Sequence, residues 1–251
     1  MKKFLIFGGL GFIGTNLSIF LLNKGFDVTA YDNCISDQSP LNIKILKSYK
    51  KFKFVKGDIN KKIKLNKNFD FIINLACIAS PIQYQKYPLE TLKASSIGIL
   101  NILDYCNKYK PLKLIHSSTS EIYGDPLEHP QKENYYGNVN TVGPRSCYDE
   151  GKRFAETALF LHKKDLNISI IRIFNTYGPY MSKNDGRFVS NFITQALQNK
   201  PITIYGNGNQ TRSICFIDDL IKGIFKTCNK NIFGPFNLGN PKEYRVIDLA
   251  H

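Results

Sequence analysis

The chain has 251 residues, 43% of them hydrophobic and 13% aromatic, which is enough for one well-buried domain and excludes a wholly disordered protein. No apolar run reaches the roughly 18–20 residues of a membrane helix, and MKKFLIF lacks a signal-peptide cleavage site, so we expect a cytoplasmic protein without a membrane partner. The net charge of +14 is spread along the chain without a basic-aromatic stripe, so it favours an anionic small molecule and predicts no nucleic-acid partner.

Short apolar runs alternate with helical patterns over the first two thirds of the chain. This alternation predicts an α/β fold, a Rossmann-like doubly wound parallel sheet with crossover helices. The expected strands are 3–7, 27–31, 52–56, 70–75, 112–117 and 168–173, and the expected helices are 12–24, 88–108 and 147–164.

A glycine-rich loop follows the first expected strand. GGLGFIG places Gly8, Gly11 and Gly14 in a Gly-x-x-Gly-x-x-Gly pattern, with Phe12 and Ile13 inside it, at the start of an apolar helix. Such a loop lets a pyrophosphate approach the backbone at a helix N-terminus. A glycine-rich turn can also serve packing alone, but the strand–loop–helix order favours a dinucleotide cofactor.

Acidic residues end the next two strands. Asp32, 18 residues beyond the last glycine of the loop, is expected with Asn33 to bind the adenosine ribose. Its charge favours NAD over NADP, because it would repel a 2′-phosphate. Asp58 and Ile59 are expected near the adenine, although aspartate is also common at strand ends. Leu75 ends the fourth strand and is expected to line the cofactor site, to pack in the core, or both.

A possible catalytic pair occurs in YDEGK. Tyr148 and Lys152 are four residues apart and would share one helix face. The ammonium group and a nicotinamide ring would both lower the tyrosine pKa, so that Tyr148 could take a proton from a substrate hydroxyl while hydride passes to NAD. The pattern alone is common and also fits an exposed helix face.

A polar segment, HSSTSEIYGDP (116–126), follows the fifth strand. The carboxyl ends of the strands form the ligand crevice of a doubly wound sheet. Thr119 is therefore expected to bond the reacting hydroxyl, with Ser120 and Glu121 beside the substrate. A Ser/Thr-rich helix cap is the alternative interpretation.

The pattern changes after residue 175, where turn signals become dense. We therefore expect an NAD-binding Rossmann-like domain over 1–174 and a smaller, interleaved substrate region over 175–251. The last segment, VIDLAH, predicts a helix that has only begun, so we expect the substrate region to be incomplete. The six cysteines contain no Cys-x-x-Cys pair and predict neither disulfides nor a metal site.

STSEIYGDP, HPQKENYYGNVN and GPRSCYDEGKRFAET resemble the signature run of UDP-glucuronate decarboxylases, which belong to the extended short-chain dehydrogenase/reductase superfamily. The resemblance continues in LACIASPIQYQ, RIFNTYGP, NDGRFVSNFITQAL, YGNGNQTRSICFIDDL and FNLGNP. It implies a three-step reaction on UDP-glucuronate. NAD⁺ oxidises carbon 4, the resulting β-keto acid loses CO₂, and NADH reduces the ketone to give UDP-xylose.

The resemblance also implies roles for particular residues. Tyr148 would be the base and Lys152 its electrostatic partner, with Thr119, Ser120 and Glu121 around the sugar. Further substrate contacts would fall on Lys93, Asn175, Arg187, Tyr205 and Arg212, and Arg212 would clamp a carboxylate or phosphate through its planar donor fork. For each of these arginines a surface ion pair is the alternative.

This sequence departs from the family at several positions. Ser95, Tyr136 and Tyr180 stand where the family usually has Asn, Trp and Arg, and the family usually continues some tens of residues past GNP. The family is usually dimeric, which makes helices 88–108 and 147–164 the candidates for a homodimer interface.

Two other functions stay open. A nucleotide-sugar 4,6-dehydratase or 4-epimerase of the same superfamily is the nearest rival, but a dehydratase is expected to carry Asp where this chain has the small, neutral Ser120. An inactive NAD-binding module is the alternative from another class. The complete set of Tyr148, Lys152 and Thr119 argues against it.

Overall fold

A computed structural model describes residues 1–251, and its centre is a single seven-stranded sheet in which all strands run parallel. The strand order is β10–β6–β5–β4–β1–β2–β3. The strands are β1 Lys3–Phe7, β2 Asp27–Asp32, β3 Phe52–Lys56, β4 Phe71–Asn74, β5 Lys113–Thr119, β6 Ile168–Ile173 and β10 Phe236–Leu238. The order reverses between β1 and β4, which is where doubly wound sheets bind ligands. The predicted fold class is confirmed.

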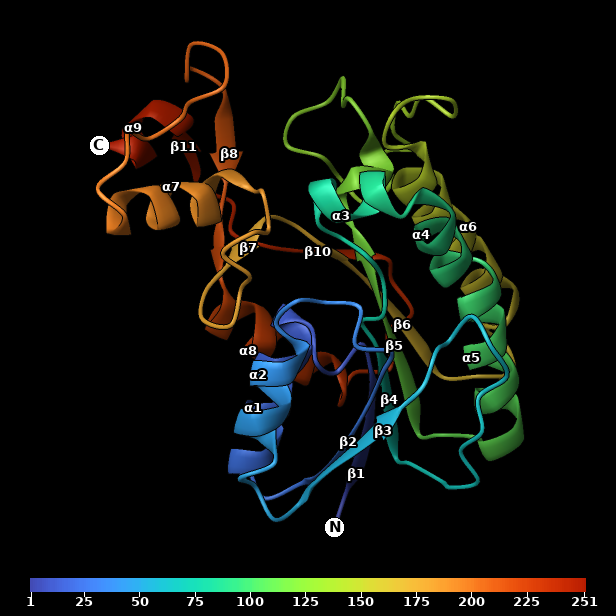
Figure 1. Cartoon of the computed structure of the whole chain (residues 1–251). Coiled ribbons are helices and arrows are strands. Elements are labelled where there is room, and N and C mark those ends of the chain that lie inside the picture. Colours follow the sequence, from blue (N-terminus) through green and yellow to red (C-terminus); the bar gives the residue numbers. More distant parts are fainter.

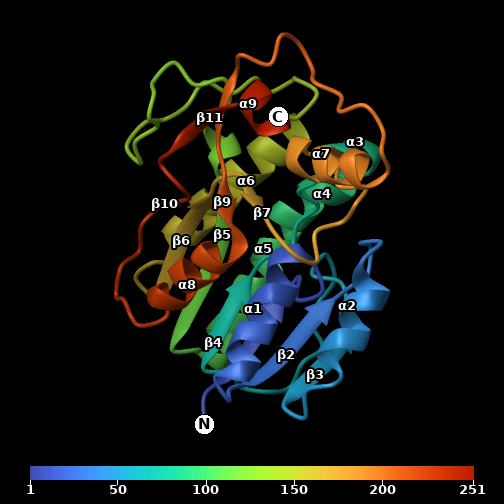
Figure 2. The same cartoon turned by 90° about the vertical axis from the view of Figure 1, so that its left-hand side faces the viewer.

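Helices cover both faces of the sheet (Figure 1). One face carries α1 (Phe12–Asn23), α2 (Ser39–Leu46) and α8 (Ile217–Thr227), and the other carries α4 (Pro88–Ser95), α5 (Ile97–Tyr109) and α6 (Ser146–Leu161). Figure 2 looks onto the α1 layer in front of the strands. Each layer seals its own apolar core, so the central strands are buried on both sides. None of the helices is both long and apolar enough to cross a bilayer.

The strand predictions are confirmed closely. The segments 3–7, 52–56 and 168–173 form strands with the predicted bounds, and the other three differ by one or two residues at one or both ends. Strands buried on both faces consist of continuous apolar runs bounded by polar turns, which makes their limits readable from sequence. The predicted helices 12–24 and 147–164 form α1 and α6.

The predicted helix 88–108 is wrong as a single element, because it breaks at Ser96 into α4 and α5. The backbone of Ser96 leaves helical geometry, with φ −110° and ψ −83°. Its hydroxyl donates to the carbonyl of Leu92 at 2.8 Å, and its N–H is shared between the carbonyls of Leu92 and Lys93. A serine hydroxyl that bonds back to residue i−4 competes with the helix ladder and bends the helix.

Most of the chain after β6 lies at the upper left of Figure 1. It contains β7 (Thr176–Tyr177), α7 (Phe188–Leu197), β8 (Thr211–Ser213), β9 (Cys215–Phe216), β11 (Glu243–Arg245) and α9 (Val246–Ala250). Strand β7 pairs with β9, and β8 pairs antiparallel with β11. The helix expected at the chain end is α9.

Two segments of this region return to the sheet. Phe225 of α8 packs its ring 5.3 Å from that of Phe20 on α1, and β10 pairs with β6. The region beyond residue 174 is thus interleaved with the sheet, and the division of the chain at that residue stays a prediction.

Candidate active site

A cavity of about 360 Å³ opens at the carboxyl edge of the sheet, above the point where the strand order reverses. Its wall combines the glycine loop, the ends of β4, β5 and β6, the start of α6, and two arginines from the region after β6. A second cavity of about 240 Å³ lies over the ends of β2 and β3. The two share Gly8, Gly11, Leu75 and Cys77, so together they form a continuous crevice.

The glycine loop is shaped by close backbone contacts. Gly8 has φ +74°, and a Cβ there would lie 2.8 Å from the backbone of Leu75 and Ala76. A Cβ on Gly14 would overlap the carbonyl oxygen of Gly8. Gly11 differs, since a Cβ would meet only that same oxygen, at 3.4 Å. Two of the glycines are therefore required by the loop itself, while Gly11 faces the cavity.

Asp32 braces this loop from the end of β2. Its carboxylate accepts hydrogen bonds from the backbone N–H of Leu10 at 3.0 Å and of Cys34 at 2.8 Å. Burial raises the pKa of Asp32, and the two backbone hydrogen bonds lower it. The carboxylate still lines the second cavity with Asn33 and keeps lone pairs for a further donor.

The remaining residues expected around the cofactor also line the crevice. Asp58 and Ile59 face the second cavity, whereas Phe12 and Ile13 face the first. Leu75 borders both. Their places agree with a bound dinucleotide, and their individual roles stay predictions.

The predicted catalytic residues meet in the first cavity. Tyr148, Lys152, Thr119, Ser120 and Glu121 all line it. The Lys152 ammonium donates to the carbonyl of Ser117 at 2.8 Å and lies 5.8 Å from the centre of the Tyr148 ring. Thr119 Oγ1 accepts from the N–H of Glu121 at 3.2 Å and so caps the short 3₁₀ turn Ser120–Tyr123. Thr119 thus has the capping role considered above and also faces the cavity.

The tyrosine itself is 6% exposed, and its ring stacks on Tyr84 with centres 5.4 Å apart. Burial raises the pKa of Tyr148, Cys77 and Glu121 raise it further, and Thr119 and Arg187 lower it. Among the protein's own groups, desolvation of the phenolate therefore outweighs the contacts that favour it. The lower pKa expected from Lys152 together with a bound nicotinamide stays a prediction.

Charged side chains also line the first cavity. Glu121 forms an ion pair with Arg145, which also lies 3.5 Å from the carboxylate of Asp149. Arg187 is paired with Asp185. Arg212 makes only a hydrogen bond to its neighbouring backbone carbonyl at Thr211 (2.7 Å), so its guanidinium has no carboxylate partner.

The predicted substrate residues do not all gather there. Asn175, Arg187 and Arg212 line the cavity. Lys93 lies on α4 outside it, and Tyr205 is 74% exposed in the loop after α7, also outside it. The substrate roles of these five residues stay predictions, and the structure offers no support for those of Lys93 and Tyr205.

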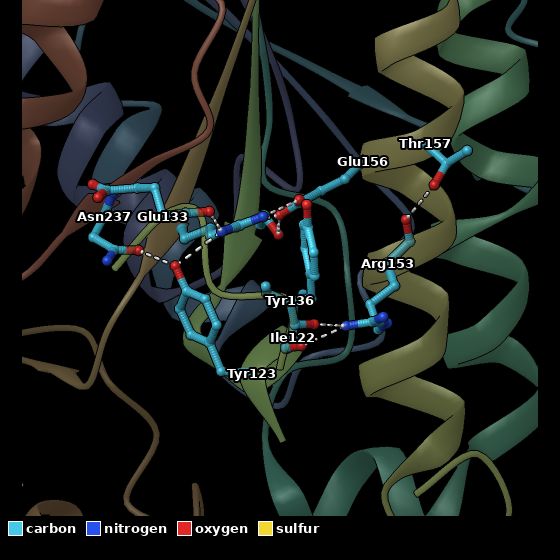
Figure 3. Close-up of polar contacts among 10 residues, drawn as sticks. Ile122, Tyr123, Glu133, Tyr136, Arg153, Glu156, Thr157 and Asn237 are labelled. Carbon is cyan, nitrogen blue, oxygen red and sulfur yellow. Dashed lines mark hydrogen bonds and ion pairs between the residues drawn. The ribbon is translucent and has the colours of Figure 1, made fainter. Parts of the chain in front are cut away.

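The three departures from the family have different surroundings. Ser95 Oγ lies 3.5 Å from the sulfur of Cys77, beside the cavity. Tyr180 has φ +67° and lines a small cavity of about 160 Å³ next to Arg187. Tyr136 is 88% exposed, and only its carbonyl is engaged, by the guanidinium of Arg153 at 2.8 Å (Figure 3).

A buried polar network fixes the turn that carries Glu121. The hydroxyl of Tyr123 donates to Asn237 Oδ1 of β10 at 2.7 Å and accepts from Arg172 at 2.9 Å (Figure 3). Arg172 of β6 also forms a paired contact with Glu156 of α6. The network ties the turn after β5 to β6, to α6 and to β10, which holds the turn that carries Glu121 in place.

Sequence reasoning did not single out Cys77, Tyr84 and Arg145 of the cavity wall, nor Asp149 beside Arg145. Arg145 and Asp149 belong to the quoted run GPRSCYDEGKR, and Cys77 and Tyr84 belong to the quoted run LACIASPIQYQ, so both motifs contained the signal. Neither run shows by itself which of its residues reach Tyr148, because only the fold brings them together.

Comparison with known proteins agrees with this geometry. Residues 4–239 match the model of the NAD dependent epimerase/dehydratase family. The chain is 44% identical over 250 residues to UDP-glucuronic acid decarboxylase 1 of Arabidopsis thaliana, covering 99% of this chain and 57% of that protein. It is also 44% identical to decarboxylase 3 of the same plant, with 72% of that protein covered. The chain thus spans about six tenths of the first relative's length.

A solved structure shares the architecture. UDP-glucuronic acid 4-epimerase from Bacillus cereus, in complex with UDP-glucuronic acid and NAD, superimposes with a TM-score of 0.84. It is 28% identical, and the match covers 99% of this chain and 81% of the epimerase chain. With its Rossmann-like sheet and its family match over almost the whole length, the chain belongs to the NAD dependent epimerase/dehydratase family.

Proposed function

We propose that this protein uses NAD to decarboxylate UDP-glucuronate to UDP-xylose through a 4-keto intermediate. The observation that carries the proposal is the convergence of Tyr148, Lys152 and Thr119 with the glycine loop in one crevice. The similarity to named UDP-glucuronic acid decarboxylases selects this reaction within the family.

The residues present fit NAD. The glycine loop is packed tightly at Gly8 and Gly14 and presents no side chain at Gly11, where a pyrophosphate would approach. Asp32 offers an acceptor to an adenosine ribose without the positive charge that a 2′-phosphate needs. Asn33, Asp58 and Ile59 would surround the adenosine, and Leu75 would lie along the dinucleotide. When bound, the cofactor supplies the hydride acceptor for carbon 4 and later the donor.

The protein's own groups would manage the protons. As a phenolate, favoured by the positive charges of Lys152 and of a bound nicotinamide, Tyr148 would take the proton of the 4-hydroxyl, with Thr119 holding the same oxygen. The 4-ketone makes the sugar a β-keto acid, so loss of CO₂ leaves an electron pair that the ketone accepts as an enolate. Carbon 5 of this enolate is then protonated, and return of hydride and of the Tyr148 proton to carbon 4 and its oxygen completes UDP-xylose.

The site must also recognise the carboxylate that leaves. Arg212 is the guanidinium on the cavity wall that has no carboxylate partner, which makes it the group to receive an anionic sugar. Ser120 is small and neutral and would not repel that carboxylate. Arg187 and Asn175 are proposed to contact the diphosphate side of the substrate, and Arg187 would do so while bound to Asp185.

Product analysis tests the proposal. The purified protein with NAD⁺ and UDP-glucuronate should release CO₂ and form UDP-xylose, measured by anion-exchange chromatography and mass spectrometry. A C4-epimer of the substrate would identify a 4-epimerase instead, and a 4-keto-6-deoxy product from a UDP-hexose would identify a 4,6-dehydratase. Tight NAD binding without turnover of any nucleotide sugar would indicate an inactive NAD-binding module.

The expected homodimer is also part of this proposal. The outer layer of α4, α5 and α6 exposes large apolar side chains, including Leu89, Leu100, Phe154 and Leu161. A second copy of the chain would cover them, since an apolar face of this kind is typical of an interface. Sedimentation equilibrium should give twice the chain mass for the wild-type protein. The double variant Leu100→Lys with Phe154→Lys should give the mass of a single chain. The cytoplasmic location stays a prediction.

A further inference from the structure

Asp149 directly follows the catalytic tyrosine in α6, and its side chain is buried. The residue is 5% exposed, yet it is an aspartate. It lies in the first turn of α6, where the helix dipole favours a negative charge. Its Oδ1 atom is buried without a hydrogen-bond partner, so helix stability alone does not account for the carboxylate.

The other oxygen of Asp149 contacts Arg145. Both Nε and Nη2 of Arg145 lie 3.5 Å from Asp149 Oδ2, and Nη2 also bonds Glu121. One guanidinium therefore serves two carboxylates, one from α6 and one from the turn after β5. Because Arg145 and Glu121 are partly exposed, at 41% and 35% of their side chains, neither is fixed by packing. Asp149 is buried and is therefore the most firmly held of the three side chains.

We infer that Asp149 is a positioning residue of the active site, which holds Arg145 and through it fixes the carboxylate of Glu121 beside Tyr148 and Thr119. Long side chains such as arginine lose rotamer entropy when they are ordered, and an anchored guanidinium loses less of it when the substrate binds. The link to catalysis rests on the proposed function, whereas the link from Asp149 to Glu121 rests on the contacts alone.

The groups around Asp149 set the pH range over which Asp149 can hold Arg145. Arg145 faces it from the residue before α6, Glu121 from the turn after β5, and Glu150 from α6 itself. Tyr84 of α3 (Pro81–Lys86) faces the same guanidinium. Burial raises the pKa of Asp149 to about 6, Glu121 and Glu150 raise it too, and Arg145 lowers it. Below about pH 6 Asp149 takes up a proton and its hold on Arg145 weakens.

The first test compares Asp149→Ala and Asp149→Asn with Glu150→Gln. Glu150 is the adjacent acid on the same helix and pairs outward with Arg153, so it is a matched control. We expect Asp149→Ala to lower kcat roughly ten- to hundredfold, the loss of one charge-assisted contact, with NAD affinity within about twofold. Asp149→Asn should lose less, and Glu150→Gln almost nothing. An unchanged kcat in Asp149→Ala would overturn the inference.

A double-mutant cycle separates positioning from a general structural role. If Asp149 acts through Glu121, then Asp149→Ala combined with Glu121→Gln should be no slower than Glu121→Gln alone. Additive losses would show that Asp149 acts elsewhere and would overturn the inference. The pH profile of kcat should also lose its limb near pH 6 in Asp149→Asn.

A structural measurement keeps the inference testable if the reaction proves to be a different one. Crystal structures of the protein and of Asp149→Ala at pH 8 should differ in the Arg145 guanidinium and in the Glu121 carboxylate, while the Tyr148 ring stays in place. An unmoved Arg145–Glu121 pair would overturn the inference whatever the substrate. Absence of UDP-xylose with a displaced pair would instead count against the proposed function alone.

Discussion

Around the glycine loop the wall of the crevice is backbone, whereas around Tyr148 it is charged side chains. The loop admits no Cβ at Gly8 or Gly14, so its shape depends on the absence of side chains. The side around Tyr148 depends on charged side chains, of which Arg145 and Glu121 hold each other while Arg212 bonds only to the carbonyl of Thr211. A backbone-built site has one shape, while a site built from ion pairs can be changed residue by residue. This difference accounts for a family that shares a cofactor half and varies its sugar chemistry.

The largest effect is expected where the two halves meet. Tyr148→Phe removes the proton-carrying hydroxyl and keeps the ring that stacks on Tyr84. We expect kcat to fall about a thousandfold or more, with NAD affinity and melting temperature almost unchanged. Steady-state kinetics with UDP-glucuronate and calorimetric NAD titration measure this. Wild-type turnover in Tyr148→Phe would remove the tyrosine from the mechanism.

The backbone-built half is tested by two alanines. Gly14→Ala creates an overlap with Gly8, so both NAD affinity and melting temperature should fall. Overpacking costs about 1–3 kcal/mol, or roughly 5- to 150-fold in the NAD dissociation constant if all of it opposes binding. Gly11→Ala has room in the protein alone, so it should weaken NAD binding with little loss of melting temperature. If the two variants lost NAD affinity and melting temperature to the same extent, Gly14 would not be the glycine that the loop needs and Gly11 the one that the cofactor needs.

The side-chain-built half is tested through Arg212. Arg212→Gln should raise KM for UDP-glucuronate roughly 10- to 100-fold, the size of a lost charge-assisted hydrogen bond. The inhibition constant of UDP-glucose, which lacks the carboxylate, should stay within about threefold. Lys222→Gln, an exposed cation on α8, is the control for net charge. An equal loss for both nucleotide sugars would assign Arg212 to the diphosphate instead.

The smallest effect concerns stability. Burial raises the pKa of Asp149 from its ordinary 3.8 to about 6, so the folded protein binds this proton more tightly than the unfolded chain. The resulting stability is fully present below about pH 4 and is lost as the pH rises through about 6. Asp149→Asn lacks this titration, so its melting temperature relative to wild type should rise by a few degrees between pH 4 and pH 7. If the melting temperatures of the two proteins changed equally with pH, this would contradict the raised pKa of Asp149.

The sequence predicted the backbone-built half better than the other half. Strands such as 3–7 and 168–173 are short, mostly apolar segments, and the glycine pattern is local, so both are readable without the fold. The break at Ser96 was missed because it depends on a single hydroxyl that bonds back to the helix. The sequence predicted an interleaved region after residue 174 but not that α8 and β10 are the segments that return, because their packing partners are distant in sequence.

The charged half depends on distances that no local pattern contains. The motif predicted that Tyr148 and Lys152 share a face, and both line the cavity. It did not reveal that burial would raise the Tyr148 pKa, because desolvation depends on the tertiary fold. Nor did it reveal that Arg145 divides its guanidinium between two carboxylates. Pairwise contacts across elements therefore need coordinates.

The hydrogen bonds that Asp32 accepts from Leu10 and Cys34 constrain any redesign of coenzyme preference. An engineer seeking activity with NADP would first replace this acid by a small or basic residue. Such a replacement also withdraws the acceptor that steadies the phosphate loop, so affinity for both coenzymes would drop together. Asparagine or serine at this position, with a new arginine supplied from the neighbouring loop, keeps an acceptor for the loop while admitting the extra phosphate.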